Sequence, residues 1–325
     1  MKFLINLSIV LSGILFWTSC RNDVLPESPH WMRIPGIEDS IKEMTILNDK
    51  CLISTQDNGF IVVDINDFSF VRYNTTNSHL WENVINSVVT DESGGIWVGT
   101  FRYGLWRYHN NIWDHFHLLN SSLPDNSVRS IAVDQNNKII IGTWNGLATY
   151  DGSQWQIYND TNSPLPDNKI RKVAVSPAGD ICIGTHEGGL VIKEAGQWIN
   201  YNTGNSALTD NQIRFIKFDL AGNLWTASYE KFYKRENNKF AVMDENNTGI
   251  SSPYVNDIAF QDDRIYYATH NGFTVYRDNT WLRYYAENSE LPHNIVDAVA
   301  VDKNGNKWIG TFGGLVIYNE EGVKY

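Results

Sequence analysis

The seven residues Asn162-Ser-Pro-Leu-Pro-Asp-Asn168 form a phrase that the chain repeats. The pattern Asn-Ser-x-Leu-Pro-x-Asn recurs whole at 120–126 and 288–294, and in altered form at 77–83, 205–211 and 247–253. A short apolar run follows each copy, and then come an Ile-Gly-Thr-like run, a Gly-Leu pair and an aromatic run. The phrase therefore marks the start of a supersecondary unit that the chain copies many times.

The first apolar residue of each unit gives the period of the repeat. These residues lie 44, 43, 42, 43, 42 and 41 positions apart, at Ile41, Ile85, Val128, Ile170, Ile213, Val255 and Val296. Each unit holds four short β-forming runs separated by Gly, Asn and Asp. Seven such units predict an all-β fold, a single seven-bladed propeller of four-stranded antiparallel blades over residues 31–325.

The ends of the repeat predict how the ring closes. Trp31-Met-Arg-Ile34 has the aromatic pattern of an outer strand, yet it precedes the first complete unit, and the last unit lacks such a strand. We therefore expect Trp31 to Ile34 to complete the seventh blade, which would remove the open edge of the ring.

Several recurring residues have a structural interpretation. Tryptophans at 113, 155, 198 and 281 stand on the predicted outer strands and favour packing between blades. The repeated phrase favours a rigid loop, because its Pro fixes φ and its Asn side chains satisfy backbone groups. The turns after Asp91, Asp134, Asp219 and Asp302 are predicted to be hairpins rather than calcium loops, since the downstream acidic ligand is absent.

Composition excludes some classes of partner. The 325-residue chain has a formal net charge of −11, which argues against nucleic acid as a partner. Its three cysteines form no Cys-x-x-Cys or Cys/His metal spacing. Cys182 takes a strand position that holds Trp in three other units and is expected to be a small buried hydrophobe, with no disulfide to Cys51.

The N-terminus reads as a secretory signal over residues 1–20, followed by a tether over 21–30. Lys2 is followed by an apolar stretch that is short for a membrane span, and Thr18 and Ser19 precede Cys20. This arrangement resembles a bacterial lipoprotein signal, although Trp17 replaces the usual Leu, and it implies lipidation at Cys20. A periplasmic or cell-surface protein that contacts the outer membrane only through its lipid is expected. Ordinary secretion and an uncleaved anchor remain open.

The repeated motifs resemble a known family. Asn162-Ser-Pro-Leu-Pro-Asp-Asn168, Trp308-Ile-Gly-Thr311 and Gly313-Gly-Leu315 are similar to the two-component regulator propeller repeat. That family forms the periplasmic sensor of many hybrid histidine kinases of gut Bacteroidetes, which detect oligosaccharides. The resemblance implies a sensing propeller and an oligosaccharide ligand. It does not imply kinase activity, because those sensors usually carry paired propellers followed by kinase and receiver domains, whereas this sequence holds one ring.

Variable residues at one end of the predicted ring are the candidate binding site. The positions directly after the strand openers hold Lys42, Asn86, Arg129, Arg171, Arg214, Asn256 and Asp297. Loops between the second and third strands should lie at the same end. Arginines beside aromatic rings suit a sugar that bears carboxylate or sulfate groups. The ligand-binding candidates are Arg129, Arg171, Arg214, Arg102, Tyr103, Trp144, His186, Glu187, Tyr229, Glu230, His270 and Phe312.

Other interpretations stay open. The arginines could instead tie neighbouring blades together through carboxylates and backbone carbonyls. A protein-binding scaffold at the cell envelope is one alternative function, and a propeller lyase that uses His186, Glu187, Glu230 and His270 is another. His115 and His117 could bind a metal but lack a partner carboxylate. We expect a non-catalytic protein with no cofactor and no metal.

Overall fold

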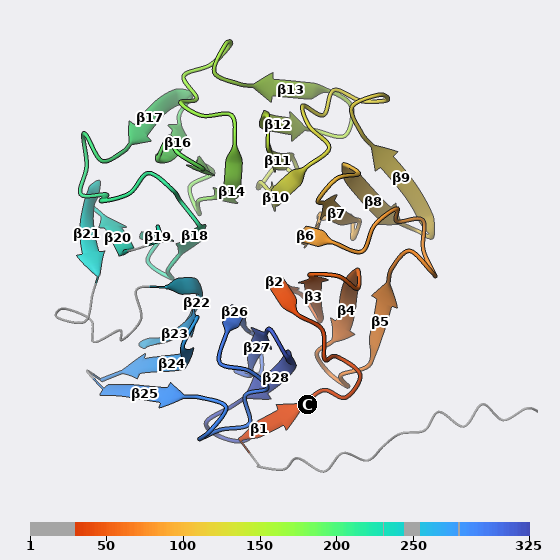
Figure 1. Ribbon diagram of the computed structural model, residues 1–325, viewed down its shortest axis with the longest axis vertical. Helices are drawn as coiled ribbons and strands as arrows, with labels where there is room; N and C mark the ends of the chain where they lie inside the picture. Colours follow the sequence, from red (N-terminus) through yellow and green to blue (C-terminus); the bar gives the residue numbers. More distant parts are fainter. Residues whose placement is uncertain (1–29, 230, 244–253, 279) are drawn as a thin grey trace, which may run out of the picture.

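The computed structural model describes residues 30–229, 231–243, 254–278 and 280–325. Seven four-stranded antiparallel sheets are arranged in a ring, as Figure 1 shows, and the described residues contain no helix. Residues of all seven blades line a cavity on the axis of the ring, which we call the channel. The predicted seven-bladed, all-β propeller is confirmed. The signal predicted for 1–20 and the tether predicted for 21–30, apart from His30, lie outside the described residues. None of the described segments forms a helix long and apolar enough to cross a membrane.

Six blades each take four consecutive strands, counted from the channel outward. Blade 1 contains β2 (Ile41–Leu47), β3 (Lys50–Thr55), β4 (Phe60–Asp64) and β5 (Phe70–Tyr73). Blade 2 contains β6 (Ile85–Thr90), β7 (Ile96–Thr100), β8 (Leu105–His109) and β9 (Ile112–Phe116). Blade 3 contains β10 (Val128–Val133), β11 (Ile139–Thr143), β12 (Gly146–Tyr150) and β13 (Trp155–Tyr158).

The next three blades repeat the pattern. Blade 4 contains β14 (Ile170–Val175), β15 (Ile181–Thr185), β16 (Leu190–Glu194) and β17 (Gln197–Tyr201). Blade 5 contains β18 (Phe215–Phe218), β19 (Leu224–Ala227), β20 (Phe232–Glu236) and β21 (Lys239–Met243). Blade 6 contains β22 (Val255–Gln261), β23 (Arg264–Thr269), β24 (Gly272–Arg277) and β25 (Thr280–Tyr284).

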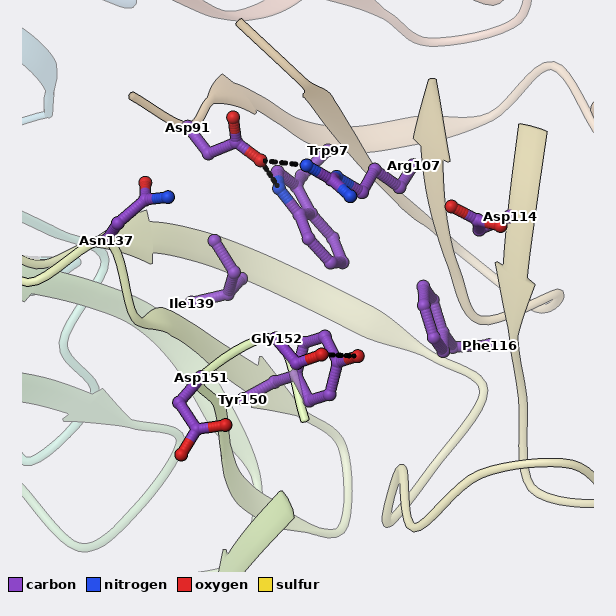
Figure 2. A pocket seen from close by; sticks show the side chains of 10 residues that line it. All are labelled: Asp91, Trp97, Arg107, Asp114, Phe116, Asn137, Ile139, Tyr150, Asp151 and Gly152. Atoms are coloured by element: carbon purple, nitrogen blue, oxygen red, sulfur yellow. Dashed lines mark hydrogen bonds and ion pairs between the residues drawn. The ribbon is translucent and has the colours of Figure 1, made fainter. Parts of the chain in front are cut away.

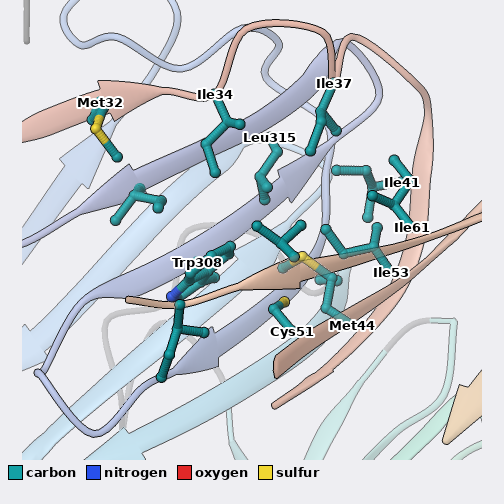
Figure 3. Packing of buried hydrophobic residues seen from close by; sticks show 14 residues of the cluster. Met32, Ile34, Ile37, Ile41, Met44, Cys51, Ile53, Ile61, Trp308 and Leu315 are labelled. Carbon is teal, nitrogen blue, oxygen red and sulfur yellow. The ribbon is translucent and has the colours of Figure 1, made fainter. Parts of the chain in front are cut away.

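Blade 7 joins the two ends of the chain. Its strands are β26 (Val296–Val301), β27 (Lys307–Thr311), β28 (Gly314–Tyr318) and β1 (Trp31–Arg33). Strand β1 pairs antiparallel with β28, with Trp31 opposite Tyr318. The predicted closure is confirmed, one residue shorter than expected. Figure 3 shows Met32 and Ile34 packed in one apolar cluster with Trp308 of blade 7 and Ile53 of blade 1.

The repeated phrase forms a rigid loop between blades. In the copy at 162–168, the Asn162 side chain accepts a hydrogen bond from the Asn159 amide and donates one to the Ile157 carbonyl. The Asn168 side chain accepts from the Asp160 amide, and Leu165 is buried. The copies at 120–126 and 205–211 repeat these bonds. The prediction of a structural loop is confirmed for these copies.

The second strand of a blade touches the first strand of the next. A Cβ at Gly142 would lie 2.6 Å from Ile170, and one at Gly310 would lie 2.5 Å from Ile41. Only glycine allows this approach, so the Ile-Gly-Thr motif sets the spacing between blades. Cys182 is buried at the predicted strand position.

One strand boundary was predicted wrongly. The first strand of blade 5 begins at Phe215 rather than at Ile213. The Ile213 amide bonds to Thr185 of blade 4, so this residue belongs to the connection between the two blades.

Candidate functional site

In six of the seven blades a β-bulge directs one residue at the channel. The register between the first two strands shifts directly after the opener, for example between Val128 and Ser130 and between Ile170 and Lys172. Six blades carry this shift. A bulge leaves one residue unpaired and redirects its side chain. The unpaired positions, with Arg214 of blade 5, line one cavity of about 160 Å³ at the end of the channel. We call them the mouth ring: Lys42, Asn86, Arg129, Arg171, Arg214, Asn256 and Asp297.

Hydrogen bonds connect much of the mouth ring around the channel. Lys42 Nζ donates to Asn86 Oδ1 at 2.6 Å, and Asn86 Nδ2 donates to the carbonyl of Val128 at 2.8 Å. On the other side, Arg214 Nη2 donates to Asn256 Oδ1 at 2.6 Å, and Asn256 Nδ2 donates to Asp297 Oδ1 at 3.1 Å. The two asparagines therefore carry contacts between neighbouring blades.

The three arginines lie against aromatic rings, as predicted. The Arg129 guanidinium carbon is 5.2 Å from the centre of the Trp144 ring, and those of Arg171 and Arg214 are 5.5 and 4.9 Å from Tyr229. Arg171 Nε also donates to His186 Nδ1 at 2.9 Å. Cation–π contacts hold guanidinium groups without neutralising them, so their positive charge stays available to a ligand.

The electrostatics of the mouth ring favour an anion. It holds four cationic side chains and one carboxylate in a protein whose formal net charge is −11. Burial, followed by the charge of Arg129, lowers the pKa of Lys42 to about 8. Burial raises the pKa of Asp297 to about 6, against the opposing charges of Arg214, His293 and Lys42. Both shifts reflect partial dehydration, which strengthens an ion pair formed at this place.

Below the mouth ring, the charges pair with one another. Lys172 Nζ of blade 4 contacts the Glu43 carboxylate of blade 1 across the channel. Lys217 Nζ lies 3.2 Å from Asp257 Oδ1. A ligand that enters the mouth therefore meets unpaired positive charge first and an internally neutralised layer beneath it.

The remaining candidates lie on loops of the same end but do not all converge. Glu187 is exposed and lies 3.9 Å from His186, and His270 stacks on Tyr254 rather than on an arginine. Phe312 contacts His293. Arg102 and Tyr103 belong to a loop of blade 2, where Arg102 lies over Phe101. Glu230 lies outside the described residues.

Not every residue of this face was predicted to bind the ligand. The sequence placed Lys42, Asn86, Asn256 and Asp297 here, after the openers, but only the arginines at these positions were predicted to be ligand-binding residues. Phe101 contacts Arg129 at 5.8 Å and was also left out of the candidates. Trp81 and Tyr254 were not predicted either; both are exposed on loops at the mouth end, and the sequence does not distinguish an exposed aromatic residue from a buried one.

A hollow at the opposite end is structural. It has a volume of about 320 Å³, lies between blades 2 and 3 and is drawn in Figure 2. In it the Asp91 carboxylate accepts hydrogen bonds from Trp97 Nε1 at 2.9 Å and Arg107 Nη2 at 3.0 Å. The turn aspartates of blades 5 and 7 bond to their tryptophans in the same way. These aspartates anchor hairpins, as predicted, and the described residues contain no cluster of three metal-ligating side chains.

The chain is similar to a known repeat family and to solved propeller structures. The family model of the two component regulator propeller matches residues 79–102 and 122–145. No curated protein sequence matches the chain. The fold is similar to structures described as extracellular domains of two hybrid two component systems from B. thetaiotaomicron, with TM-scores of 0.73 and 0.69 and identities of 19% and 17%. The alignments cover 89% and 90% of this chain but only 42% and 40% of theirs.

A further structure, virginiamycin B lyase from Staphylococcus aureus, has a TM-score of 0.69 and 12% identity. That alignment covers 89% of this chain and 97% of the lyase. At such identities these structures show the shared fold alone.

Proposed function

We propose that this chain, which contains two-component regulator propeller repeats, is a non-catalytic extracytoplasmic sensor that binds an anionic oligosaccharide at its mouth ring. The observation that carries the proposal is the excess of positive charge in the mouth ring of an acidic protein. Guanidinium groups recognise carboxylates and sulfates through paired hydrogen bonds.

The arginines retain donors for such a ligand. Arg214 Nη1 is buried, and none of the described groups accepts a hydrogen bond from it. A buried donor without an acceptor is costly, and a ligand oxygen at the mouth would remove that cost. The Arg129 guanidinium rests on the Phe101 and Trp144 rings, which orient it at the channel entrance.

The aromatic rings at the mouth support a sugar as the ligand class. A pyranose presents C–H groups on one face and hydroxyl groups at its edge, so it fits an aromatic surface flanked by polar donors. Tyr229 and Phe101 are both exposed beside the arginines. A simple inorganic anion would not need these surfaces.

The competing functions find less support at this face. A protein-binding scaffold would favour a broad apolar surface, whereas the centre of this one is cationic. A lyase would favour a histidine and a carboxylate directed at one enclosed point. The described candidates His186 and Glu187 are 3.9 Å apart, and Glu187 is largely exposed to solvent.

The proposed location follows from the N-terminal residues. Signal-like residues 1–20 would export the protein, and Cys20 would carry the lipid that holds it at the outer membrane. Several acyl chains would be needed, because a single chain gives only marginal membrane affinity.

Binding measurements test the proposal directly. The chain from Arg21 onward is titrated by calorimetry with uronate-bearing, sulfated and neutral oligosaccharides. We expect anionic members to bind, and Arg171→Ala to weaken binding about 10- to 100-fold, since a charged hydrogen bond contributes about 1.5–3 kcal/mol. The melting temperature should change little, because the Arg171 side chain hydrogen-bonds to His186 and lies over the Tyr229 ring but forms no buried ion pair with a described residue of another blade.

The matched control is Arg277→Ala. Arg277 is half-exposed at the end of β24, at the turn end of blade 6 opposite the mouth. This variant should bind as the wild type does. If Arg171→Ala instead lowered stability and left affinity unaltered, the arginines would be ties between blades and the proposal would be wrong.

A further inference from the structure

One tryptophan of the mouth face lies outside the mouth ring. Trp81 is 58% exposed, although its large apolar surface would normally be buried. It belongs to the loop that leads from blade 1 into β6 of blade 2. Trp81 also contacts a second exposed aromatic residue, Tyr103, and a contiguous exposed apolar patch beside a candidate site points to contact with a ligand or partner.

The loop itself does not need this tryptophan. Trp81 stands where the three complete copies of the repeated phrase have Pro124, Pro166 and Pro292. The preceding leucine is buried in each of these copies, and its amide bonds to the serine two residues earlier in the same way. The same leucine anchor therefore forms with either residue, and the conformation of the loop does not require Trp.

Neighbouring rings hold the Trp81 indole in a fixed orientation. Tyr103, Trp106 and His115 meet it edge to face, at centroid distances of 5.9, 5.8 and 4.6 Å. His115 is itself fixed, because it stacks on Trp106 at 3.7 Å and its Nε2 lies 2.6 Å from the Tyr103 carbonyl oxygen. A ring that is already ordered loses little conformational entropy when it binds a ligand.

An aromatic surface connects Trp81 with the mouth ring. Tyr103 contacts Trp81, and Phe101 of the same loop contacts the Arg129 guanidinium at 5.8 Å. All three aromatic residues are exposed. The surface thus runs outward from Arg129 over blade 2, and Arg102 lies over its Phe101 ring.

We propose that Trp81 forms an outer subsite that stacks a pyranose ring of the bound oligosaccharide. This inference rests on the proposed function. The anionic sugar unit occupies the mouth ring, and the following units extend over the loop at 101–103 to Trp81. The outer unit is recognised by its apolar face, so it requires no charge.

The experiment compares ligands of increasing length. Uronate-bearing and sulfated saccharides of one to six units are titrated into the wild type, Trp81→Pro and Trp81→Phe. Trp81→Pro introduces the residue of the three complete copies and should keep the melting temperature. In the wild type, affinity should rise with length until the outer unit reaches Trp81. Trp81→Pro should lose about 3- to 10-fold in affinity for the longer members and nothing for the monosaccharide.

The variants separate this inference from the proposed function. Trp81→Phe should keep most of the gain with length, because it keeps an aromatic face. Equal affinities of Trp81→Pro and the wild type for every length would overturn the outer subsite while the mouth ring stands. Binding that survives Arg171→Ala but fails in Trp81→Pro would overturn the mouth ring as the centre of the site. If no anionic saccharide binds the wild type, both proposals fail.

Discussion

At the scale of single residues, Asp297 makes the mouth ring sensitive to pH. Burial raises its pKa to about 6. As pH falls from 7.5 to 5, Asp297 takes up a proton and the mouth ring loses its carboxylate charge. We expect affinity for an anionic saccharide to rise about 3- to 10-fold over this range. Such a rise means that the bound saccharide raises the pKa of Asp297 by about half to one unit. Asp297→Asn should bind at pH 7.5 as tightly as the wild type does at pH 5.

The same shift has a consequence for stability. The folded protein holds the Asp297 proton more tightly than the unfolded chain does, so the free energy of unfolding should fall as pH rises from about 4 to about 6. Asp297→Asn should remove this contribution and be more stable than the wild type at pH 7.5. Calorimetric titrations and urea unfolding at pH 5 and 7.5 measure both effects. An unchanged pH profile in Asp297→Asn would show that this carboxylate does not control binding.

The sequence predicted only some of the residues that form the candidate site at the mouth. Arg129, Arg171 and Arg214 were found because a fixed repeat position puts them at one end of the ring. Trp81 was missed because its significance depends on exposure, and a sequence does not show that the ring remains outside the core. Asp297 was placed at this end by its position, but its raised pKa could not be predicted, because it comes from burial in the folded ring.

At the scale of strands, glycine in the Ile-Gly-Thr motif controls how closely blades approach. A Cβ at Gly310 would lie 2.5 Å from Ile41 Cγ2 and 3.3 Å from Met44 Cε, across the junction of blades 7 and 1. Gly310→Ala should lower the free energy of unfolding by about 1–3 kcal/mol, the usual cost of overpacking. Urea denaturation followed by tryptophan fluorescence measures the loss.

The control for this substitution is Gly204→Ala. A Cβ at Gly204 would meet only the Asn202 side chain, at 3.1 Å, in a loop. We expect little change there. Equal stability of Gly310→Ala and the wild type would show that the blades can move apart, and the account of their spacing would then be wrong.

The positions of the strands could be predicted because the repeat has a regular period. The bulges within the strands could not be predicted. The openers Ile41, Ile85, Val128, Ile170, Val255 and Val296 begin strands as expected. In a segment as short as Val128-Arg-Ser-Ile131, the pattern of apolar and polar residues does not reveal a bulge. The direction of the Arg129 side chain therefore became clear only from the strand register. In blade 5 the apolar pattern placed the strand start too early, because Ile213 bonds to the preceding blade.

At the scale of the whole molecule, stability depends on a closure between distant parts of the chain. Trp31 of β1 lies 4.5 Å from Tyr318 and 5.1 Å from Tyr284, measured between ring centroids. Nearby, the Asn319 amide donates to the His30 carbonyl at 2.9 Å, and the Leu315 amide donates to that of Ile37 at 3.1 Å. The ring is therefore closed by hydrogen bonds and by apolar burial together (Figure 3).

Trp31→Ala should weaken this closure more than a comparable change elsewhere. Removing a buried tryptophan costs about 3–5 kcal/mol, and here the loss falls on the junction that joins the N-terminal strand to blade 7. We expect a lower urea midpoint and faster hydrogen exchange at the β28 amides, because an open blade exposes its edge to water. Trp198→Ala, on the half-buried outer strand of blade 4, is the matched control. It should cost less and should leave exchange in β28 unchanged, because β17 follows β16 directly in the chain. If both variants lost the same stability and β28 stayed protected in Trp31→Ala, the ring would be held by packing between blades alone.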